Sequence, residues 1–142
     1  MVKEVHLYFK YLYTIKREID LVTKVLIVED IPLNMELILD IFRAMNFIAN
    51  GASNGEEAVR MTEKEQYDLI IMDVEMPVMD GMTAIKIIKK NPSYANIPIV
   101  VLTAYAMKGD REKFLAQGCD DYIAKPIDVP SFMKKMEKYR KE

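Results

Sequence analysis

The stretch Lys24-Val-Leu-Ile-Val-Glu-Asp30 decides how the rest of the chain is interpreted. It begins as a run of branched apolar residues, which is the pattern of a strand buried on both faces of a sheet. It ends on two carboxylates, so negative charge follows directly where the strand stops. A helical pattern begins at Pro32, a residue that suits the first turn of a helix. The stretch therefore opens a β–α unit.

The same alternation repeats until the chain has five such units. We expect strands over residues 24–29, 47–52, 68–73, 97–102 and 121–124. We expect helices over residues 32–45, 55–66, 82–90, 109–117 and 130–139. Five β–α units predict an α/β fold with a doubly wound parallel sheet, a flavodoxin-like (βα)5 arrangement with strand order 2-1-3-4-5.

Local signals refine two of these helices. Ser53-Asn54-Gly55-Glu56 looks like a capping box that opens the second helix, and Gly118 is placed to end the fourth. The helix after Pro32 carries an apolar stripe at helical spacing, formed by Leu33, Leu37, Ile38, Ile41 and Met45.

Residues 1–22 form an N-terminal extension ahead of the domain that we expect over residues 23–142. Residues 7–15 alternate apolar and polar side chains in a way that also suits a strand. We favour a helix, because Ile19 and Val22 continue a helical stripe. The stripe consists of Val5, Phe9, Leu12, Ile15, Ile19 and Val22. Such a helix would pack on the domain or form a dimer contact.

Composition limits the classes of function. The 142 residues are 51% hydrophobic, which allows one domain with a sizeable core. A net charge of −2 gives no reason to expect a nucleic-acid or membrane-surface partner. The single cysteine, Cys119, permits no internal disulfide, and we expect it in the core. The chain has no apolar run of membrane-spanning length and no signal-peptide pattern, so we expect a cytoplasmic protein.

Polar side chains stand where the predicted strands end. Glu29 and Asp30 follow the first strand, Asp73 ends the third, Thr103 follows the fourth and Lys125 follows the fifth. Ligands of open parallel sheets bind beyond the carboxyl ends of the strands, so these side chains should meet in one crevice. Any one of them alone is more often a helix cap or a surface charge, and the prediction depends on their joint occurrence.

Their chemistry suits phosphoryl transfer. Three carboxylates in one crevice repel each other, and Mg²⁺ is a cation that carboxylate oxygens bind well. Lys125 adds a positive charge and Thr103 a hydroxyl donor, which together suit the charge of a phosphoryl group. Asp73 is central, and a carboxylate can act as the acceptor by forming an acyl phosphate.

These residues lie in motifs that resemble the receiver domains of bacterial two-component response regulators, the CheY-like superfamily. The resemblance covers about residues 23–139, and residues 103–110 are similar to stand-alone receivers and to receivers of hybrid histidine kinases. The matching motifs are Val25-Leu-Ile-Val-Glu-Asp30, Met72-Asp73-Val-Glu-Met-Pro77, Met79-Asp80-Gly81, Leu102-Thr103-Ala104 and Tyr122-Ile-Ala-Lys-Pro126.

The resemblance implies a role for each acidic residue. Asp73 would be the phosphoacceptor, and Asp30, Asp73 and the backbone carbonyl of Glu75 would bind Mg²⁺ directly. Glu29, which stands where many receivers have Asp, would reach the ion through water. We also expect Glu75 and Tyr105 to flank the crevice and to tune the lifetime of the phosphoryl group.

The resemblance also implies how the other residues act. Lys125 would pair with the phosphoryl oxygens, and the Lys125–Pro126 peptide bond would be cis. Thr103 would move toward the phosphoryl group, and the ring of Tyr122 would turn inward in response.

The implied function is a two-component switch that is no enzyme beyond its own phosphorylation and dephosphorylation. Its partners would be a histidine kinase or a histidine phosphotransfer protein, and a downstream protein target. One alternative is a receiver fragment of a hybrid histidine kinase, with residues 1–22 as linker. Another is an aspartyl-phosphate phosphohydrolase, which is less favoured because Glu75 stands where such enzymes usually carry a second Asp.

Overall fold

A computed structural model describes residues 2–107 and 109–141. The extension was predicted to begin at Met1 and the domain to end at Glu142, and both residues lie outside the described part of the chain. Lys108 also lies outside it. All five strands pair in parallel in the order β2-β1-β3-β4-β5, which confirms the predicted fold class and strand order. The strands are β1 (Lys24–Val28), β2 (Ile48–Ala52), β3 (Leu69–Asp73), β4 (Ile99–Thr103) and β5 (Asp121–Ala124).

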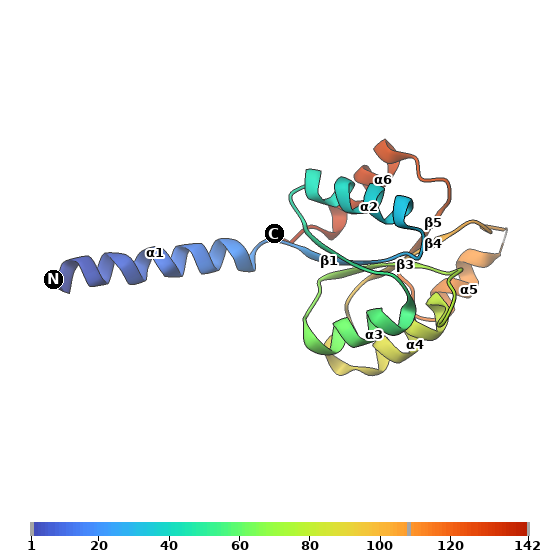
Figure 1. The fold of residues 1–142 in the computed structure, drawn as a ribbon, viewed down its shortest axis with the longest axis horizontal. Coiled ribbons are helices and arrows are strands. Elements are labelled where there is room, and N and C mark those ends of the chain that lie inside the picture. Colours follow the sequence, from blue (N-terminus) through green and yellow to red (C-terminus); the bar gives the residue numbers. More distant parts are fainter. Residues whose placement is uncertain (1, 108, 142) are drawn as a thin grey trace.

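The helices cover both faces of the sheet, and Figure 1 shows α2 and α6 on one face and α3, α4 and α5 on the other. The domain helices are α2 (Pro32–Ala44), α3 (Gly55–Lys64), α4 (Gly81–Lys90), α5 (Asp110–Ala116) and α6 (Val129–Met136). Short 3-10 turns over Pro92–Tyr94 and Glu137–Tyr139 follow α4 and α6.

Each face of the sheet has its own apolar core, because neighbouring residues of a strand point to opposite faces. In β1, Val25 and Ile27 pack under α2 and α6, whereas Leu26 and Val28 pack in the core shared by α3 and α4. Cys119 is buried in this second core as expected, and burial raises the pKa of its thiol to about 11.

The predicted apolar stripe of α2 is wrong in its first turns. Leu33 is 75% exposed and Leu37 is 43% exposed. The residues of α2 that enter the core are Ile38, Ile41 and Phe42. Leu33 and Leu37 lie on the outer side of the helix, whereas Met35, which is also in the first turn, packs against the core.

The helix α3 begins at Gly55 as predicted, but the residues that cap it are each one position later than expected. Asn54 is the N-cap, and its side chain accepts a hydrogen bond from the backbone N–H of Glu57 at 2.8 Å. The Glu57 carboxylate in turn accepts from the N–H and the hydroxyl of Ser53. The reciprocal cap is real, but it uses Asn54 and Glu57 where the sequence suggested Ser53 and Glu56. At the end of α5, Gly118 has a φ of 99° and stops the helix as predicted.

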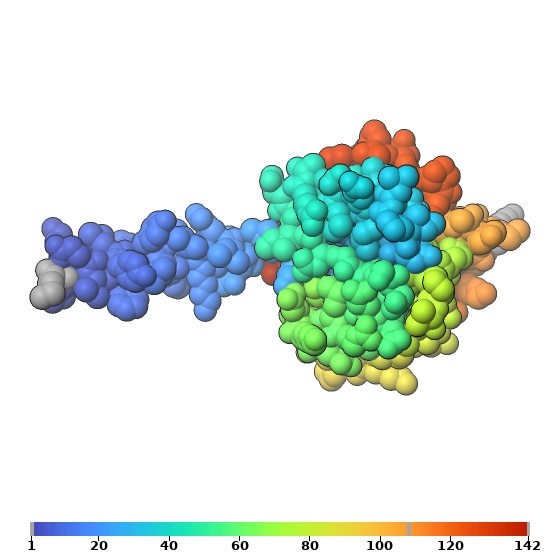
Figure 2. Space-filling view, in the orientation of Figure 1, coloured from blue at the N-terminus to red at the C-terminus, as the bar shows by residue number. Residues whose placement is uncertain are grey.

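The N-terminal segment forms a helix, α1 (Val2–Asp20), as favoured over a strand. None of its residues is buried, and it projects away from the domain (Figures 1 and 2). The expectation that it packs on the domain is therefore wrong. Within the described residues, no helix has both the length and the apolar character that crossing a membrane requires.

Candidate functional site

Three carboxylates meet where β1 and β3 end. The backbone N–H of Glu29 donates to the carbonyl of Ala52 at 3.0 Å, so Glu29 prolongs the pairing of β1 with β2. Asp73 is the last residue of β3, and both Glu29 and Asp73 are 1% exposed. One carboxylate oxygen from each of Glu29, Asp30 and Asp73 lies within 4.8 Å of the other two. The predicted convergence of these side chains is thus present.

Lys125 enters the same crevice from the end of β5. Its Nζ lies 3.0 Å from Oε2 of Glu29 and 3.1 Å from Oδ2 of Asp73. Its backbone N–H donates to the carbonyl of Thr103 at 2.8 Å, which fixes where the side chain starts. The Lys125–Pro126 peptide bond is cis, as the resemblance implied.

The charges in this cluster alter each other's protonation. Burial, together with the negative charge of Glu29, raises the pKa of Asp73 to about 7, and the nearby Lys125 ammonium offsets only part of that rise. Burial alone would lower the pKa of Lys125, but its contacts with Glu29 and Asp73 outweigh this and raise that pKa. The rise at Asp73 thus comes first from its burial, and the rise at Lys125 comes from the two carboxylates that it contacts.

Thr103, at the end of β4, is engaged by a neighbour that the sequence did not reveal. Its hydroxyl donates to Oε1 of Glu75 at 2.8 Å and accepts from the backbone N–H of Tyr105 at 3.1 Å. The backbone N–H of Glu75 reaches Oδ1 of Asp73 at 3.3 Å. Sequence analysis considered Glu75 as a carbonyl ligand and as a flanking residue, and no sequence signal placed its carboxylate on Thr103.

The ring of Tyr122 packs on a helix of the domain, on the side of β5 that faces α5. The residue pairs with Val101 in the sheet, two residues before the end of β5. Its half-buried ring lies against Phe114 of α5, with ring centroids 5.9 Å apart. Tyr105, which was expected at the rim of the crevice, is 69% exposed.

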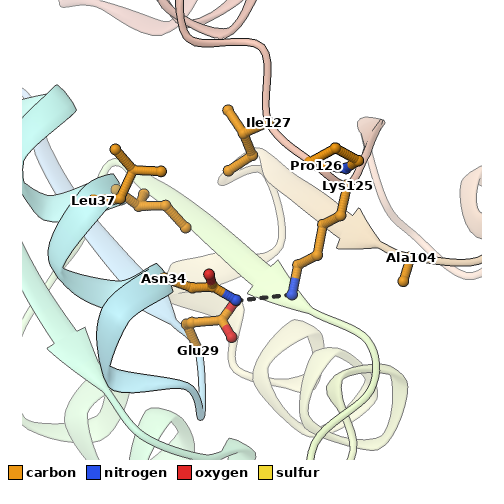
Figure 3. Close-up of a pocket in the computed structure, with 8 residues that line it drawn as sticks. Glu29, Asn34, Leu37, Ala104, Lys125, Pro126 and Ile127 are labelled. Carbon is orange, nitrogen blue, oxygen red and sulfur yellow. Dashed lines mark hydrogen bonds and ion pairs between the residues drawn. The ribbon is translucent and has the colours of Figure 1, made fainter.

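A pocket of about 380 Å³ opens beside Lys125, between α2 and the segment that follows β5. Figure 3 shows Lys125 reaching toward Glu29, and Leu37 and Ile127 are apolar residues that line the same pocket. Asn34, in the first turn of α2, also lines this pocket, although no role was predicted for it. No local pattern of the sequence singles it out.

The residues present suit a divalent cation. Glu29, Asp30 and Asp73 offer hard oxygen atoms from three directions, which is the kind of ligand that Mg²⁺ prefers. Among the residues that the structure describes, Lys125 is the one basic side chain paired with Glu29 and Asp73. The pKa of Asp73 is raised first by its burial and then by the negative charge of Glu29, so a bound cation would favour its ionised form.

Comparison with known proteins agrees with this geometry. The profile of the response regulator receiver domain matches residues 25–137. The chain belongs to this family. The receiver is 39% identical over 115 residues to the polar-differentiation response regulator DivK of Brucella anthropi, and the match covers 81% of the chain and 94% of DivK.

Two solved receivers have the same fold. One is the receiver domain of a sensor histidine kinase from Pseudomonas aeruginosa, which was solved with a magnesium ion in its active site cleft. It is 35% identical to this chain with a TM-score of 0.76, and the match covers 83% of the chain and 97% of that domain. The chemotaxis regulator CheY4 of Vibrio cholerae is 26% identical with a TM-score of 0.79, covering 83% and 98%. The chain is therefore a response-regulator receiver of two-component signalling.

Proposed function

We propose that this receiver accepts a phosphoryl group on Asp73 from a phosphohistidine of a histidine kinase or a phosphotransfer protein. The observation that carries the proposal is the buried cluster in which Lys125 contacts both Glu29 and Asp73. Asp73 is a buried carboxylate with one cationic partner and an excess of negative charge around it. Such an arrangement does little to stabilise the fold, because burying a charge without neutralising it is costly. It suits a site that receives a cation and a phosphoryl group.

Glu29, Asp30 and Asp73, together with the backbone carbonyl of Glu75, are the groups that would hold Mg²⁺. When bound, the ion supplies positive charge that neutralises the carboxylates and the phosphoryl oxygens. A carboxylate oxygen of Asp73 forms a bond to phosphorus as the phosphorus–nitrogen bond of the phosphohistidine breaks, and the electron pair of that bond goes to the imidazole nitrogen. Lys125, fixed within 3.1 Å of Asp73, is placed to pair with the transferred oxygens.

Thr103 and Tyr122 are the residues that would convert this step into a conformational change. The Thr103 hydroxyl now donates to Glu75, and it would exchange this acceptor for a phosphoryl oxygen. Its departure would let the ring of Tyr122, which is already packed on Phe114, turn further inward. The altered surface around β5 would then bind a downstream protein with a different affinity.

Intact-mass measurement after incubation with acetyl phosphate and Mg²⁺ tests the phosphoacceptor directly. Wild type should gain about 80 Da, the mass of one phosphoryl group, and Asp73→Asn should gain nothing. Asp40→Asn makes the same chemical change at an exposed position of α2 and should be phosphorylated like wild type. Phosphorylation of a folded Asp73→Asn variant, or none in wild type, would refute the proposal.

A further inference from the structure

The exposed helix α1 carries a seam of apolar side chains with a strict seven-residue repeat. Within α1, positions 5, 12 and 19 are Val, Leu and Ile, and positions 8 and 15 are Tyr and Ile; Val22 continues the repeat just beyond the end of the helix at Asp20. This spacing, repeated three times, is the a and d pattern of a coiled coil. Four of the six residues are β-branched, a class that packs well in such seams.

Nothing within the described part of the chain covers this seam. Tyr8 is 60% exposed, Ile19 is 57% exposed and Leu12 is 41% exposed. A single helix of 19 residues is marginally stable in water, because most helical stability comes from packing an apolar face. The helix therefore lacks the contacts that its own seam is built to make.

The base of α1 is tied to the domain, which holds the seam clear of it. The Lys141 ammonium donates to the carbonyl of Asp20 at 3.2 Å and pairs with Asp68 at 3.0 Å. The backbone N–H of Lys141 donates to the Thr23 hydroxyl at 2.7 Å. These contacts join the end of the domain to the end of the helix, and Figure 2 shows α1 standing away from the domain along its length.

The charges on α1 point to a helix as the occupant. Lys3, Lys10 and Arg17 repeat every seven residues at the f position, which faces away from a partner helix. Lys16 and Glu18 lie on opposite edges of the seam, at the e and g positions, so like charges do not meet across it. A two-helix pair thus buries the apolar stripe and leaves the basic residues in water.

We propose that α1 pairs with the α1 helix of a second copy of this chain to form a two-stranded coiled-coil dimer. A second copy always supplies a seam of the same length and repeat, which makes a symmetric pair self-complementary. Ten seam side chains, five from the α1 helix of each copy and each losing on the order of 80 Å², bury on the order of 800 Å². That is about the area at which a specific interface is distinguished from a casual contact.

The molecular mass of the full chain in solution, measured over roughly 1 to 100 μM, tests the dimer. We expect the mass to rise with concentration from 16.5 kDa toward twice that value. Leu12→Lys combined with Ile15→Lys puts charge into the seam and should weaken dimerisation at least a hundredfold. Tyr13→Lys makes the same kind of change at an outer position that is 67% exposed, and it should leave the dimer intact.

Cysteine cross-linking supplies an independent readout. Under mild oxidation, the Leu12→Cys variant should form a disulfide-linked dimer with itself or with the Ile15→Cys variant. Seam residues of the two helices meet whether the helices run parallel or antiparallel. Tyr13→Cys is the matched control and should cross-link much less. The native Cys119 is 4% exposed and does not compete.

Three results would overturn the dimer. A 16.5-kDa mass at every concentration is one, and a dimer that survives Leu12→Lys with Ile15→Lys is another, because it would use a different surface. The third is a monomer that sediments with vesicles of equal parts zwitterionic and anionic phospholipid, which would assign the seam to a membrane surface. Labelling of each variant by acetyl phosphate verifies that its domain is folded and keeps this test separate from that of Asp73.

Discussion

At the scale of single residues, the unfavourable burial of the Asp73 carboxylate makes stability depend on pH. Its pKa is about 7 in the folded chain because of burial and Glu29, against an ordinary value of 3.8. Between these values the folded state holds a proton that the unfolded state has lost, so stability falls as pH rises from about 4 to about 7. Without Mg²⁺, Asp73→Asn should be more stable than wild type by on the order of 2 kcal/mol above pH 7, and by little at pH 4.

Urea unfolding at several pH values in the presence of a chelator measures this gain. Lys125 is not left unpaired in the variant, because Glu29 remains 3.0 Å away. Asp40→Asn, on the exposed side of α2, should leave stability nearly unchanged at every pH. A gain for Asp73→Asn that is equal at pH 4 and pH 8 would contradict the assignment.

Glu75 should slow phosphorylation, since it adds negative charge near Asp73 and occupies the Thr103 hydroxyl. Removing one hydrogen bond of about 1 kcal/mol corresponds to roughly a fivefold change in rate. We expect Glu75→Ala to accelerate labelling by acetyl phosphate about fivefold. Glu75→Gln keeps an acceptor for Thr103 but loses the charge, and its rate should lie between the two.

Stopped-flow or quenched labelling at fixed Mg²⁺ gives these rates. If Glu75→Ala and wild type are labelled equally fast, the contact with Thr103 does not oppose phosphorylation. If Glu75→Gln matches Glu75→Ala, charge alone explains the effect and the hydrogen bond plays no part.

The sequence predicted the site well wherever a side chain sits at the end of a strand. Glu29, Asp73 and Lys125 meet because parallel strands place their carboxyl ends at one edge of the sheet. The Glu75 carboxylate escaped prediction because its position depends on the loop after β3. That loop contains Val78 at a φ of 70°, a conformation that a β-branched residue rarely adopts and that no local pattern reveals.

At the scale of elements, the close approach of α4 to β3 holds Asp73 in place. Gly81 opens α4, and its N–H donates to the carbonyl of Val74 at 3.1 Å. A methyl group added to Gly81 would collide with the carbonyl oxygen of Asp73, which is backbone and cannot move aside cheaply. Gly81→Ala should therefore destabilise the domain by about 2 to 4 kcal/mol and lower labelling of Asp73.

Gly51→Ala provides the comparison for this change. An added methyl group at Gly51 meets only the end of the flexible Met35 side chain, so the loss should stay below about 1.5 kcal/mol. Denaturant midpoints of the two variants give the difference. Equal losses would show that the contact between Gly81 and Asp73 does not control how α4 packs.

The repeat of apolar residues located the strands and helices along the chain. The errors arose where packing against the rest of the fold decides which side chains are buried. Buried apolar runs predicted β1, β3 and β4, because central strands of a parallel sheet are apolar on both faces. The edge strands β2 and β5 are only partly buried. Leu33 and Leu37 fit the helical period of α2 equally well, yet they are exposed, because the side of the helix that faces the core carries Met35 and Ile38. Period alone reports which residues share a face, and it does not report which face the rest of the fold covers.

At the scale of the whole molecule, the site exists only in the folded domain. Lys125 and Glu29 are 96 positions apart in the chain and meet at 3.0 Å, and Asp73 comes from a third strand. An unfolded chain cannot bring these groups together, so any ion that binds them stabilises the folded state by mass action.

Mg²⁺ should therefore raise the thermal midpoint of the domain. At a hundred times its dissociation constant, a ligand of the folded state adds about 2.7 kcal/mol, which corresponds to a rise of roughly 10 °C for a domain of this size. Asp30→Asn removes one of the three carboxylates and should lose most of the rise, whereas Asp40→Asn should keep it.

The rise should also be smaller at pH 6 than at pH 8, because the ion must displace the proton that Asp73 holds below a pKa of about 7. Calorimetry with and without Mg²⁺ at both pH values separates this site from weak binding at surface carboxylates, which are ionised at either pH and would give the same shift at both.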